Sequence, residues 1–213
     1  AVMSPGIPSR DPFYRAAVAA ADEVMSEPEF AYRESPERWV AVTGTNGKTT
    51  TTALTAHLLN TAGIPACAVG NIGDTCIAAV ADRPAGQYLV AELSSYQLAS
   101  VSTFKPVAAT LLNITPDHLH WHGTHQAYAS AKAKLFNHMD AQTWAVLDVS
   151  TPETEEIART LAAHGVAVCT LGNATGIRGT RAVEFRGRGP RGIAALDAAR
   201  DMLRVTLGER TYK

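Results

Sequence analysis

A glycine-rich turn followed by a lysine and two threonines is the part of this sequence best suited to chemistry. Gly44 and Gly47 allow backbone N–H groups to close around anionic oxygens, and Lys48 adds a mobile cation. Thr49 offers a hydroxyl that suits Mg²⁺, and the helix that begins here presents its positive end to the same ligand. The sequence therefore predicts a site for a nucleotide triphosphate, expected to be ATP, at Gly44-Thr45-Asn46-Gly47-Lys48-Thr49-Thr50.

The spacing of the two glycines departs from the general phosphate-loop pattern. That pattern would require a glycine at position 42, where this chain has Val42, so the loop is a shorter variant. An ordinary glycine turn between a strand and a helix is the alternative interpretation. The run Gly-Lys-Thr-Thr leading directly into a helix favours phosphate binding.

A carboxylate follows a second apolar run. Glu92 comes directly after Tyr88-Leu89-Val90-Ala91, so it stands where a predicted strand reaches its ligand edge. Carboxylates beside a phosphate loop hold the Mg²⁺ of the nucleotide, directly or through water. Capping of the following helix is an equal alternative for Glu92.

Histidines gather after another predicted strand, at His118, His120, His122 and His125. A spacing of HxHxH in a loop is not the helical histidine pair of common zinc sites, and no cysteine joins the group. A closed structural zinc site is therefore not expected. We expect one of these histidines to act as a ligand or catalytic group and the others to lie on the surface.

Two further segments carry weaker signals. Asn71, in the strand-to-helix turn Gly70–Gly73, has an amide that can bind a substrate, although a plain turn is the default. Lys132 and Lys134 lie on a predicted helix, where solvated lysines are the default.

Composition limits the classes of function. The chain has 213 residues, 46% of them hydrophobic, and a formal net charge of −1, which disfavours nucleic acid as a partner. Cys67, Cys76 and Cys169 have no CxxC spacing, which suits free thiols that fill a core in a reducing cytoplasm. The sequence shows neither a leader pattern nor a long apolar run, so neither secretion nor a membrane partner is expected.

Apolar runs and helical patterns alternate from Trp39 onward. The predicted strands are Trp39–Val42, Ala66–Val69, Tyr88–Leu93, Ala108–Leu112, Trp144–Leu147 and Val166–Leu171. The predicted helices are Lys48–Ala62, one from Gly73, Thr124–Met139 and Pro152–His164. This alternation predicts an α/β fold with a mostly parallel sheet and helices on both faces. Ligands of such sheets bind at the carboxyl ends of the strands.

The N-terminal segment is predicted to belong to a different domain from the rest of the chain. Asp11 is expected to cap a helix with Pro12 at its first position and an alanine-rich body to about Val24. Such a short segment cannot build its own core. We expect residues 1–36 to be the end of a preceding domain and residues 37–213 to be a central nucleotide-binding domain.

Glycine and arginine dominate the sequence after Gly172, at 176–179 and 186–191. An RNA-binding tail is one interpretation of this composition. Short strand candidates interrupt it, at Ala182–Phe185, Met202–Leu207 and Arg210–Tyr212. They favour a small antiparallel extension instead.

Taken together, the motifs resemble the Mur ligase family over about residues 1–171. The shortened phosphate loop is that family's form, and the segments that match, in the same order, are Thr43–Thr50, Gly70–Gly73, Glu92–Leu98, Asn113–Leu119 and the Tyr-Ala-x-Ala-Lys helix. Three segments resemble the branch of the family that adds D-glutamate: Gly-Asn-Ile-Gly, Glu-Leu-Ser-Ser-Tyr-Gln-Leu and the opening Ser4-Pro5-Gly6-Ile7-Pro8.

The resemblance implies an ATP-dependent, amide-bond-forming ligase of peptidoglycan precursor synthesis. Its small-molecule partners would be UDP-N-acetylmuramoyl-L-alanine and D-glutamate, and it would work as a monomer in the cytoplasm. The ATP γ-phosphoryl group would pass to the L-alanyl carboxylate, and the D-glutamate amine would then attack the acyl phosphate. The family has an N-terminal UDP-binding domain, a central ATPase domain and a C-terminal amino-acid-binding domain, the last of which this chain is expected to lack.

The resemblance also implies roles for single residues. Lys48 would neutralise β/γ-phosphate oxygens, Thr49 would ligate the first Mg²⁺, and Glu92 with His118 would position metal near the transferring phosphoryl group. Lys132 resembles the lysine that this family carbamylates, which would place a carboxylate-like ligand near a second Mg²⁺. Contacts with the UDP-sugar are implied for Ser4, Pro5, Gly6, Asn71, Ser94 and Gln97.

Some positions depart from the family pattern. His120 stands where the family usually has aspartate, and the His-Asn motif that contacts adenine is absent, although Met202–Arg210 resembles the hairpin just upstream of it. The chain is therefore expected to be a fragment that does not ligate by itself. Two rivals stay open: a relative similar to folylpolyglutamate synthase, against which Thr49-Thr50 argues, and a nucleotide-binding module without catalysis.

Overall fold

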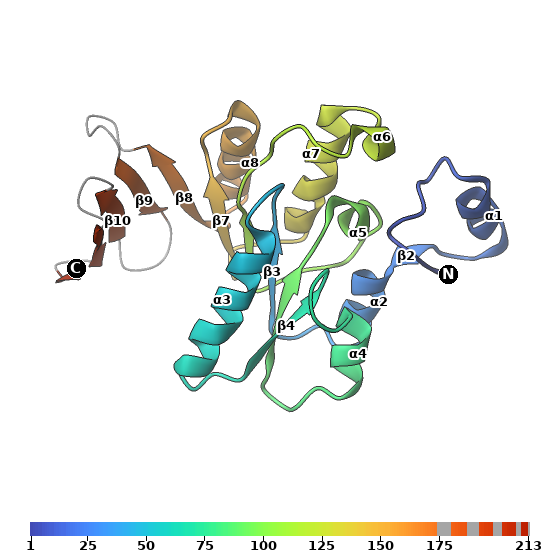
Figure 1. The fold of residues 1–213 in the computed structure, drawn as a ribbon, viewed down its shortest axis with the longest axis horizontal. Coiled ribbons are helices and arrows are strands. Elements are labelled where there is room, and N and C mark those ends of the chain that lie inside the picture. The colour runs from blue at the N-terminus through green and yellow to red at the C-terminus, as the bar shows by residue number, and fades with distance from the viewer. Residues whose placement is uncertain (174–179, 187–191, 198–201, 208–209, 213) are drawn as a thin grey trace.

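A parallel sheet forms the centre of the protein. The computed structural model describes residues 1–173, 180–186, 192–197, 202–207 and 210–212. Parallel strands lie in the order β4-β5-β3-β6-β7-β8 (Figure 1). Their bounds are β3 (Trp39–Thr43), β4 (Ala66–Gly70), β5 (Tyr88–Glu92), β6 (Ala108–Leu111), β7 (Trp144–Asp148) and β8 (Ala167–Asn173). Each of these strands was predicted from its apolar run, with bounds that differ by one or two residues.

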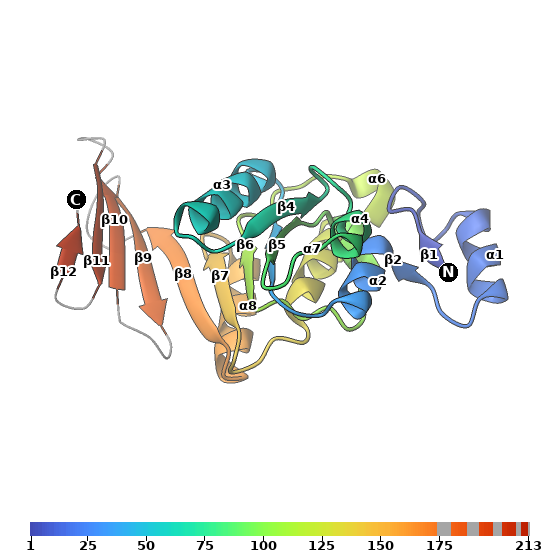
Figure 2. The same cartoon turned by 90° about the horizontal axis from the view of Figure 1, so that it is seen from below.

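Helices cover both faces of the sheet, as the alternating pattern predicted. On one face α3 (Lys48–Thr61) packs its Ala56 against Val42 and Val90. The other face is covered by α2 (Glu27–Glu34), α4 (Cys76–Ala81), α5 (Ser95–Ala99), α7 (His125–Ala133) and α8 (Pro152–Ala163). Figure 2 shows α3 on one side of the sheet and α7 and α8 on the other.

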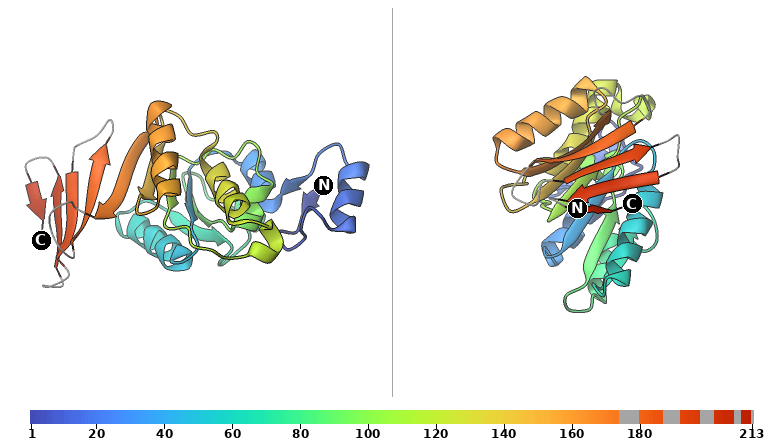
Figure 3. Two further views of the ribbon diagram at one scale, coloured as in Figure 1. Left: turned by 90° about the horizontal axis from the view of Figure 1, so that it is seen from above. Right: turned by 90° about the vertical axis from the view of Figure 1, so that its left-hand side faces the viewer.

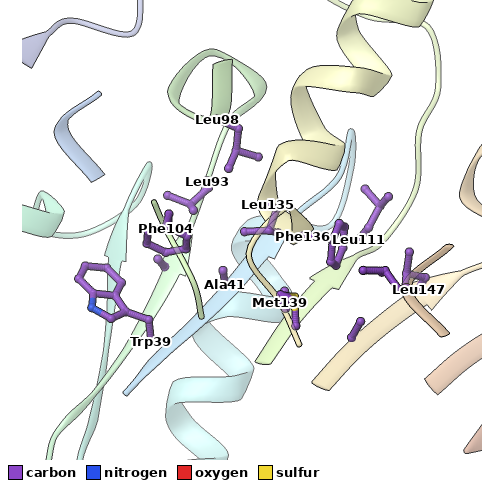
Figure 4. Close-up of a cluster of buried hydrophobic side chains, with 14 of the residues drawn as sticks. Trp39, Ala41, Leu93, Leu98, Phe104, Leu111, Leu135, Phe136, Met139 and Leu147 are labelled. Carbon is purple, nitrogen blue, oxygen red and sulfur yellow. The ribbon is translucent and has the colours of Figure 1, made fainter. Parts of the chain in front are cut away.

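The larger core lies between the sheet and the second group of helices. Successive residues of β3 point to opposite faces, so Trp39 and Ala41 enter this core while Val42 enters the smaller one under α3. The side chains that fill it gather between the strands and the segment that follows α7 (Figure 4). The rings of Trp39 and Phe104 pack edge to face with their centres 5.5 Å apart, and this contact helps to orient the tryptophan.

Two of the helices that cover the sheet, α4 and α7, are shorter than predicted at one end. The helix predicted from Gly73 begins only at Cys76, because the Thr75 hydroxyl caps it by accepting from Ala78 N at 3.3 Å. The helix predicted to reach Met139 ends at Ala133, and a 3-10 turn, η1 (Lys134–Phe136), follows it. The short helices α5 and α6 (Leu119–His122) were not predicted, because a single turn leaves no periodic pattern.

The N-terminal segment is built from two short parallel strands and one exposed helix. Strands β1 (Val2–Met3) and β2 (Met25–Ser26) pair, and α1 (Pro12–Ala20) lies between them in sequence. Asp11 caps α1 as predicted and accepts from Phe13 N at 2.8 Å. The predicted end near Val24 is wrong, since α1 stops at Ala20. Figure 1 shows this segment and the C-terminus at opposite ends of the molecule.

A buried carboxylate ties α2 to the loop before β6. Glu29 is fully buried and accepts hydrogen bonds from the backbone N–H groups of Ser102, Thr103 and Phe104 at 2.9–3.1 Å. Arg33 Nε also donates to it at 2.9 Å. Burial raises the pKa of the Glu29 carboxyl, but the hydrogen bond from the Thr103 hydroxyl at 2.6 Å, together with the bonds above, outweighs burial and holds that pKa at about 2. The ionised form is thus the one that the fold stabilises.

Replacing Glu29 by glutamine is expected to destabilise the protein by on the order of 3 kcal/mol at neutral pH. The amide of glutamine is neutral, and its NH₂ group is a donor that would face the backbone N–H donors in place of an accepting oxygen. Because the folded pKa lies below the unfolded one, the contribution of Glu29 is present above about pH 4.5 and disappears as the pH falls toward 2. Urea unfolding at several pH values measures this. Glu34→Gln, at an exposed position of the same helix, is the control. Equal unfolding midpoints for the two variants would contradict the prediction.

Four further strands continue the sheet beyond β8: β9 (Thr180–Arg186), β10 (Gly192–Asp197), β11 (Met202–Leu207) and β12 (Arg210–Tyr212). Each pairs antiparallel with its neighbour, which confirms the predicted antiparallel extension (Figure 3). β10 was not predicted. The Gly- and Arg-rich stretches that suggested an RNA-binding tail, 176–179 and 187–191, lie outside the described residues.

The cysteines are free thiols, as predicted. Cys76 and Cys169 are buried, and burial raises the pKa of each thiol, to about 11 for Cys169. Such thiols stay protonated at neutral pH and fill the core. Across the described part of the chain, no helix combines the length and the apolar character needed to cross a membrane.

Candidate phosphate and metal site

The predicted phosphate loop lies at the middle of the parallel sheet. Strand β3 lies between β5 and β6, so the loop that leaves its carboxyl end is flanked by Glu92 on one side and Asn113 on the other. The turn that follows β4 meets the same edge, because Gly70 pairs with Glu92. Residues that lie far apart in the sequence therefore surround one loop, at the edge where parallel sheets bind ligands.

The two loop glycines are required by the backbone and by close packing. A side chain on Gly44 would place its Cβ 3.0 Å from Leu112 Cβ and 3.3 Å from Asn113 N. Gly47 has φ +84°, in the left-handed region, and it stands at the N-cap of α3. Because Gly47 has no side chain to cap the helix, the first N–H groups of α3 remain available to an anion.

Asn113 holds the loop in shape, a role that the sequence analysis missed. Its Oδ1 accepts from the backbone N–H groups of Thr45 at 3.1 Å and Asn46 at 2.8 Å, and its Nδ2 donates to Asn46 O at 3.1 Å. This pairing fixes the loop from the neighbouring strand before any ligand binds. An asparagine two residues after a strand that flanks a phosphate loop is the signal that could have identified it.

The cation and hydroxyls of the loop are accessible. Thr49 and Thr50 are exposed at the start of α3, and Lys48 is half-buried. Lys48 Nζ donates to Thr45 O at 2.9 Å, so the ammonium group folds back over the loop. The carbonyl of Thr45 thus keeps this cation beside the helix N-terminus, where phosphate oxygens would meet it.

Glu92 is a buried carboxylate with one free oxygen. It is 1% exposed; its Oε1 accepts from Asn71 Nδ2 at 2.9 Å, and its Oε2 has no hydrogen-bond partner within the described residues. The capping alternative is wrong, because Ser94 and Gln97 cap α5. Asn71 instead orients Glu92, and Gly70 permits this approach, since a Cβ there would lie 2.5 Å from Glu92 O. An unpartnered buried carboxylate oxygen suits a cation ligand.

Lys132 is buried beneath the phosphate loop, which corrects the default interpretation of a solvated lysine. Its side chain is 1% exposed, and Nζ donates to Gly44 O at 2.7 Å. Nζ also lies 4.6 Å from the centre of the Tyr128 ring, whose hydroxyl is 3.0 Å from Thr45 Oγ1. Burial lowers the pKa of Lys132 to about 7, with a further decrease from Lys48 and an opposing effect from Asp117.

His118 occupies a strained position at the start of α6. Its φ of +52° is left-handed, which is rare for a residue with a side chain. Asp117 Oδ1 accepts from His118 N at 2.7 Å, and Asp117 Oδ2 lies 3.5 Å from His118 Nε2. The ring centre lies 6.1 Å from that of Tyr128, whose hydroxyl contacts the phosphate loop. The structure thus places His118 one aromatic ring away from the loop.

The other histidines do not form a metal centre. No group of three or more histidine, cysteine or acidic side chains able to hold a metal occurs in the ranges that the structure describes. His120 is exposed, as expected, but the surface interpretation is wrong for His122. The His122 ring stacks on Tyr96, its Nε2 lies 2.9 Å from Ser95 Oγ, and burial lowers its pKa to about 4, so it is neutral at pH 7.

Apart from Asn71, which contacts Glu92, the predicted substrate-contacting residues fall into two groups. Ser94 and Gln97 face each other in the capping box of α5, where Gln97 Oε1 accepts from Ser94 N at 2.9 Å. Ser4, Pro5 and Gly6 form a turn closed by Ile7 N donating to Ser4 O at 3.2 Å. That segment contacts α6, because the Arg10 guanidinium donates to the carbonyls of His120 and Trp121. The structure thus brings the N-terminal segment to the element that carries His118.

Together these groups can bind a polyanion and a cation side by side. The loop offers N–H groups and the Lys48 ammonium to phosphate oxygens. Glu92 offers a buried anionic oxygen, and the Thr49 hydroxyl is exposed in the first turn of α3. Such an arrangement stabilises negative charge that develops on a phosphoryl group during transfer.

Comparison with known proteins gives a consistent result. The family profile described as Mur ligase middle domain matches residues 42–189. The UDP-N-acetylmuramoylalanine--D-glutamate ligase of Alkaliphilus metalliredigens is 44% identical over 165 residues, which are 78% of this chain and 36% of that protein. The protein of the same name from Frankia casuarinae is 46% identical over 136 residues, 63% of this chain and 29% of the relative. This chain therefore spans about a third of the length of these curated relatives.

Solved structures share the fold. The UDP-N-acetylmuramate:L-alanyl-gamma-D-glutamyl-meso-diaminopimelate ligase from Neisseria meningitides superimposes with a TM-score of 0.56 at 18% identity, over 87% of this chain and 64% of that one. The MurF ligase from Thermotoga maritima in complex with ADP gives a TM-score of 0.52 at 17% identity, over 87% and 52% of the two chains. At these identities the likeness concerns the arrangement of helices and strands.

Proposed function

This chain belongs to the Mur ligase family, and from that premise we propose that it is the ATP-binding part of a ligase that joins D-glutamate to UDP-N-acetylmuramoyl-L-alanine. The observation that carries the proposal is the phosphate loop, held by Asn113 and flanked by the buried Glu92. The relatives that share 39–46% identity with the chain carry the name of the D-glutamate ligase, which supports that amino acid over others. Residues 1–36 would end the UDP-binding domain, and residues 37–213 would belong to the central domain.

In the proposed reaction, the substrate carboxylate attacks the γ-phosphorus of ATP and the bond to the β-phosphate oxygen breaks. This step gives an acyl phosphate and ADP. The amine of D-glutamate then attacks the acyl carbon, inorganic phosphate leaves, and the amine loses a proton as the amide forms. Lys48 would stabilise the charge on the transferring phosphoryl oxygens, and the α3 N-terminus would hold the phosphates still bound to adenosine.

The residues present fit a magnesium ion. Glu92 Oε2 is buried and unpartnered in the described structure, which is a cost unless a cation or a donor meets it. Glu92 and the Thr49 hydroxyl are oxygen ligands of the kind that Mg²⁺ prefers, and the family resemblance implies that His118 helps to position the metal. Bound Mg²⁺ would supply a charge that neutralises phosphate oxygens. Asn71 would keep the Glu92 carboxylate oriented for this role.

We extend the proposal to a carbamylated Lys132. With a pKa of about 7, a large share of this side chain is a neutral amine at physiological pH. The amine lone pair can attack the carbon of CO₂, which forms an N–C bond and releases a proton from nitrogen. The product is an anionic carbamate in place of a cation, which would suit a second Mg²⁺ beside the loop and end the unfavourable proximity to Lys48.

The proposed function is tested by supplying all substrates to the whole protein that contains this chain. We expect ADP, phosphate and the D-glutamyl product to appear in equal amounts, with D-glutamate required for phosphate release. The 213-residue chain assayed alone is expected to form no amide, because positioning both reactants contributes on the order of 7–11 kcal/mol and the amino-acid-binding part is a separate domain in the family. Amide formation by the isolated chain at rates like those of the whole protein would show that the domain assignment is wrong.

A further inference from the structure

One hydrogen bond between α5 and α6 has no part in the proposed reaction. His122 Nε2, in the last residue of α6, lies 2.9 Å from the hydroxyl oxygen of Ser95, the first residue of α5. Ser95 is only 2% exposed, so water competes little for its hydroxyl. A neutral imidazole nitrogen donates to a hydroxyl or accepts from it, so the bond forms in either tautomer of His122.

The α5 side of this hydrogen bond is held at both ends of the helix. The capping box of Ser94 and Gln97 closes its start, and Lys134 Nζ donates to the carbonyl of Ala99 at its end. The helix follows closely on Glu92, the buried carboxylate of the candidate metal site. Ser95 is therefore presented at a place that is fixed relative to Glu92.

The α6 side has fewer contacts to hold it. Among the four residues of this helix, all within the described part of the chain, none is buried. The Arg10 guanidinium donates to two backbone carbonyls of the turn, but it does so from an exposed position. The N-cap residue His118 has a left-handed φ of +52°, a conformation that persists only when surrounding contacts impose it. The position of α6 therefore depends on a small number of side-chain contacts.

A contact at the end of α6 acts on His118 at its start. The backbone N–H groups of Trp121 and His122 donate to the carbonyl of His118 at 3.0 and 3.1 Å. This single hydrogen-bonded turn moves as one unit, so a displacement of His122 is passed to His118. The His118 ring also lies 4.9 Å from the ring of Tyr96, which belongs to α5. The spacing between the two helices thus sets where the candidate catalytic histidine lies.

We propose that His122 is a positioning residue, whose hydrogen bond to Ser95 holds α6 on α5 and thereby fixes His118 relative to Glu92. This inference rests on the proposed function, in which Glu92 and His118 act at the same phosphoryl group. The competing explanation is stacking, since the rings of His122 and Tyr96 are nearly parallel, with 13° between their planes and their centres 5.6 Å apart. The two explanations differ in which part of His122 is needed.

Three variants of the whole protein separate the hydrogen bond from the stacking. His122→Phe keeps a ring and removes the bond, His122→Gln removes the ring and keeps an amide that can reach the hydroxyl, and Ser95→Ala removes the bond from the other side. We expect His122→Phe and Ser95→Ala to lower kcat roughly tenfold, His122→Gln to stay within about threefold, and KM for ATP to be unchanged in all three. The double variant Ser95→Ala/His122→Phe should lose no more than either single variant, because both remove one bond.

A measurement that does not depend on turnover reports the position of His118 directly. Histidine labelled with carbon-13 at Cε1 gives one NMR signal for each imidazole, and the signal of His118 is the one that His118→Asn lacks. The nearby Tyr96 ring shifts this signal according to their relative position. Ser95→Ala keeps every aromatic ring in place of residue, so we expect the signal to move because α6 is displaced. His164→Phe, at an exposed histidine that ends α8, is the control and should change neither kcat nor the His118 signal.

The proposal is overturned if Ser95→Ala shows the kcat and the His118 signal of the control. It is also overturned if His122→Phe keeps the kcat of the unmodified protein while His122→Gln does not, because stacking would then hold α6. In either case the unmodified protein would still form the D-glutamyl product, and the proposed function would stand. Failure of the unmodified whole protein to form a product with any amino acid would overturn the proposed function, and with it the role given to His122.

Discussion

Replacing Lys48 by alanine is expected to abolish ATP-dependent turnover in the whole protein, with a loss of kcat on the order of 10³-fold. The ammonium group is held over the phosphate loop by its hydrogen bond to Thr45 O at 2.9 Å. Phosphoryl transfer leaves little covalent work to the protein, so a cation at the transferring oxygens supplies a large part of the barrier reduction. Phosphate release under saturating ATP and Mg²⁺ measures the effect.

Lys105→Ala is the matched control for Lys48→Ala. Lys105 pairs with Asp140 at 2.6 Å, and both side chains are partly exposed, so its loss should change turnover and stability little. Turnover of Lys48→Ala within a few-fold of this control would refute the assignment of the loop as the ATP site. A folded Lys48→Ala protein with unchanged melting temperature would show that the loss concerns chemistry.

Removing the Lys132 side chain is expected to lower kcat at least about a hundredfold, because a carbamate near the phosphoryl group would be lost. Lys132→Arg should be equally inactive, since a guanidinium keeps the positive charge and does not form a carbamate. Short free carboxylates such as formate or acetate should partly restore Lys132→Ala and have no effect on Lys132→Arg. Steady-state rates with and without the added acid measure this.

A spectroscopic readout separates carbamylation from a purely structural role. After equilibration with carbon-13 bicarbonate, the protein is expected to show a carbamate carbon signal that Lys132→Ala lacks. Lys134→Ala, two residues further along the chain, removes a lysine that donates to Ala99 O and should keep the signal. An active protein without a carbamate signal would refute the modification and leave an unmodified Lys132 beneath the loop.

The fold was largely predictable because its strands are short apolar runs that turns separate from the helices. Every parallel strand of the central sheet was identified from its apolar run, because such a strand is buried along most of its length. The short parallel strands β1 and β2 were not predicted. The end of α1, the helix α2 and the short helices α5 and α6 were not predicted. The capping box of Ser94 and Gln97 holds α5, and the contacts of Arg10 with backbone carbonyls hold α6. Neither interaction produces hydrophobic periodicity in the sequence.

The chemical groups that reach the ligand edge could be identified from the residues and their order: the glycines, lysine and threonines of the phosphate loop, and the carboxylate of Glu92 after its strand. The contacts that support these groups could not, because they join residues that lie far apart in the chain. Asn113 accepts a hydrogen bond from the backbone of Asn46, which is 67 residues away in the sequence, and Lys132 donates one to Gly44, which is 88 residues away. Such contacts depend on the order of strands in the sheet, which places β3 between β5 and β6. Burial then turned Lys132 from an ordinary helix lysine into a group with a pKa of about 7, because the low-dielectric surroundings that disfavour its charge exist only once the chain has folded.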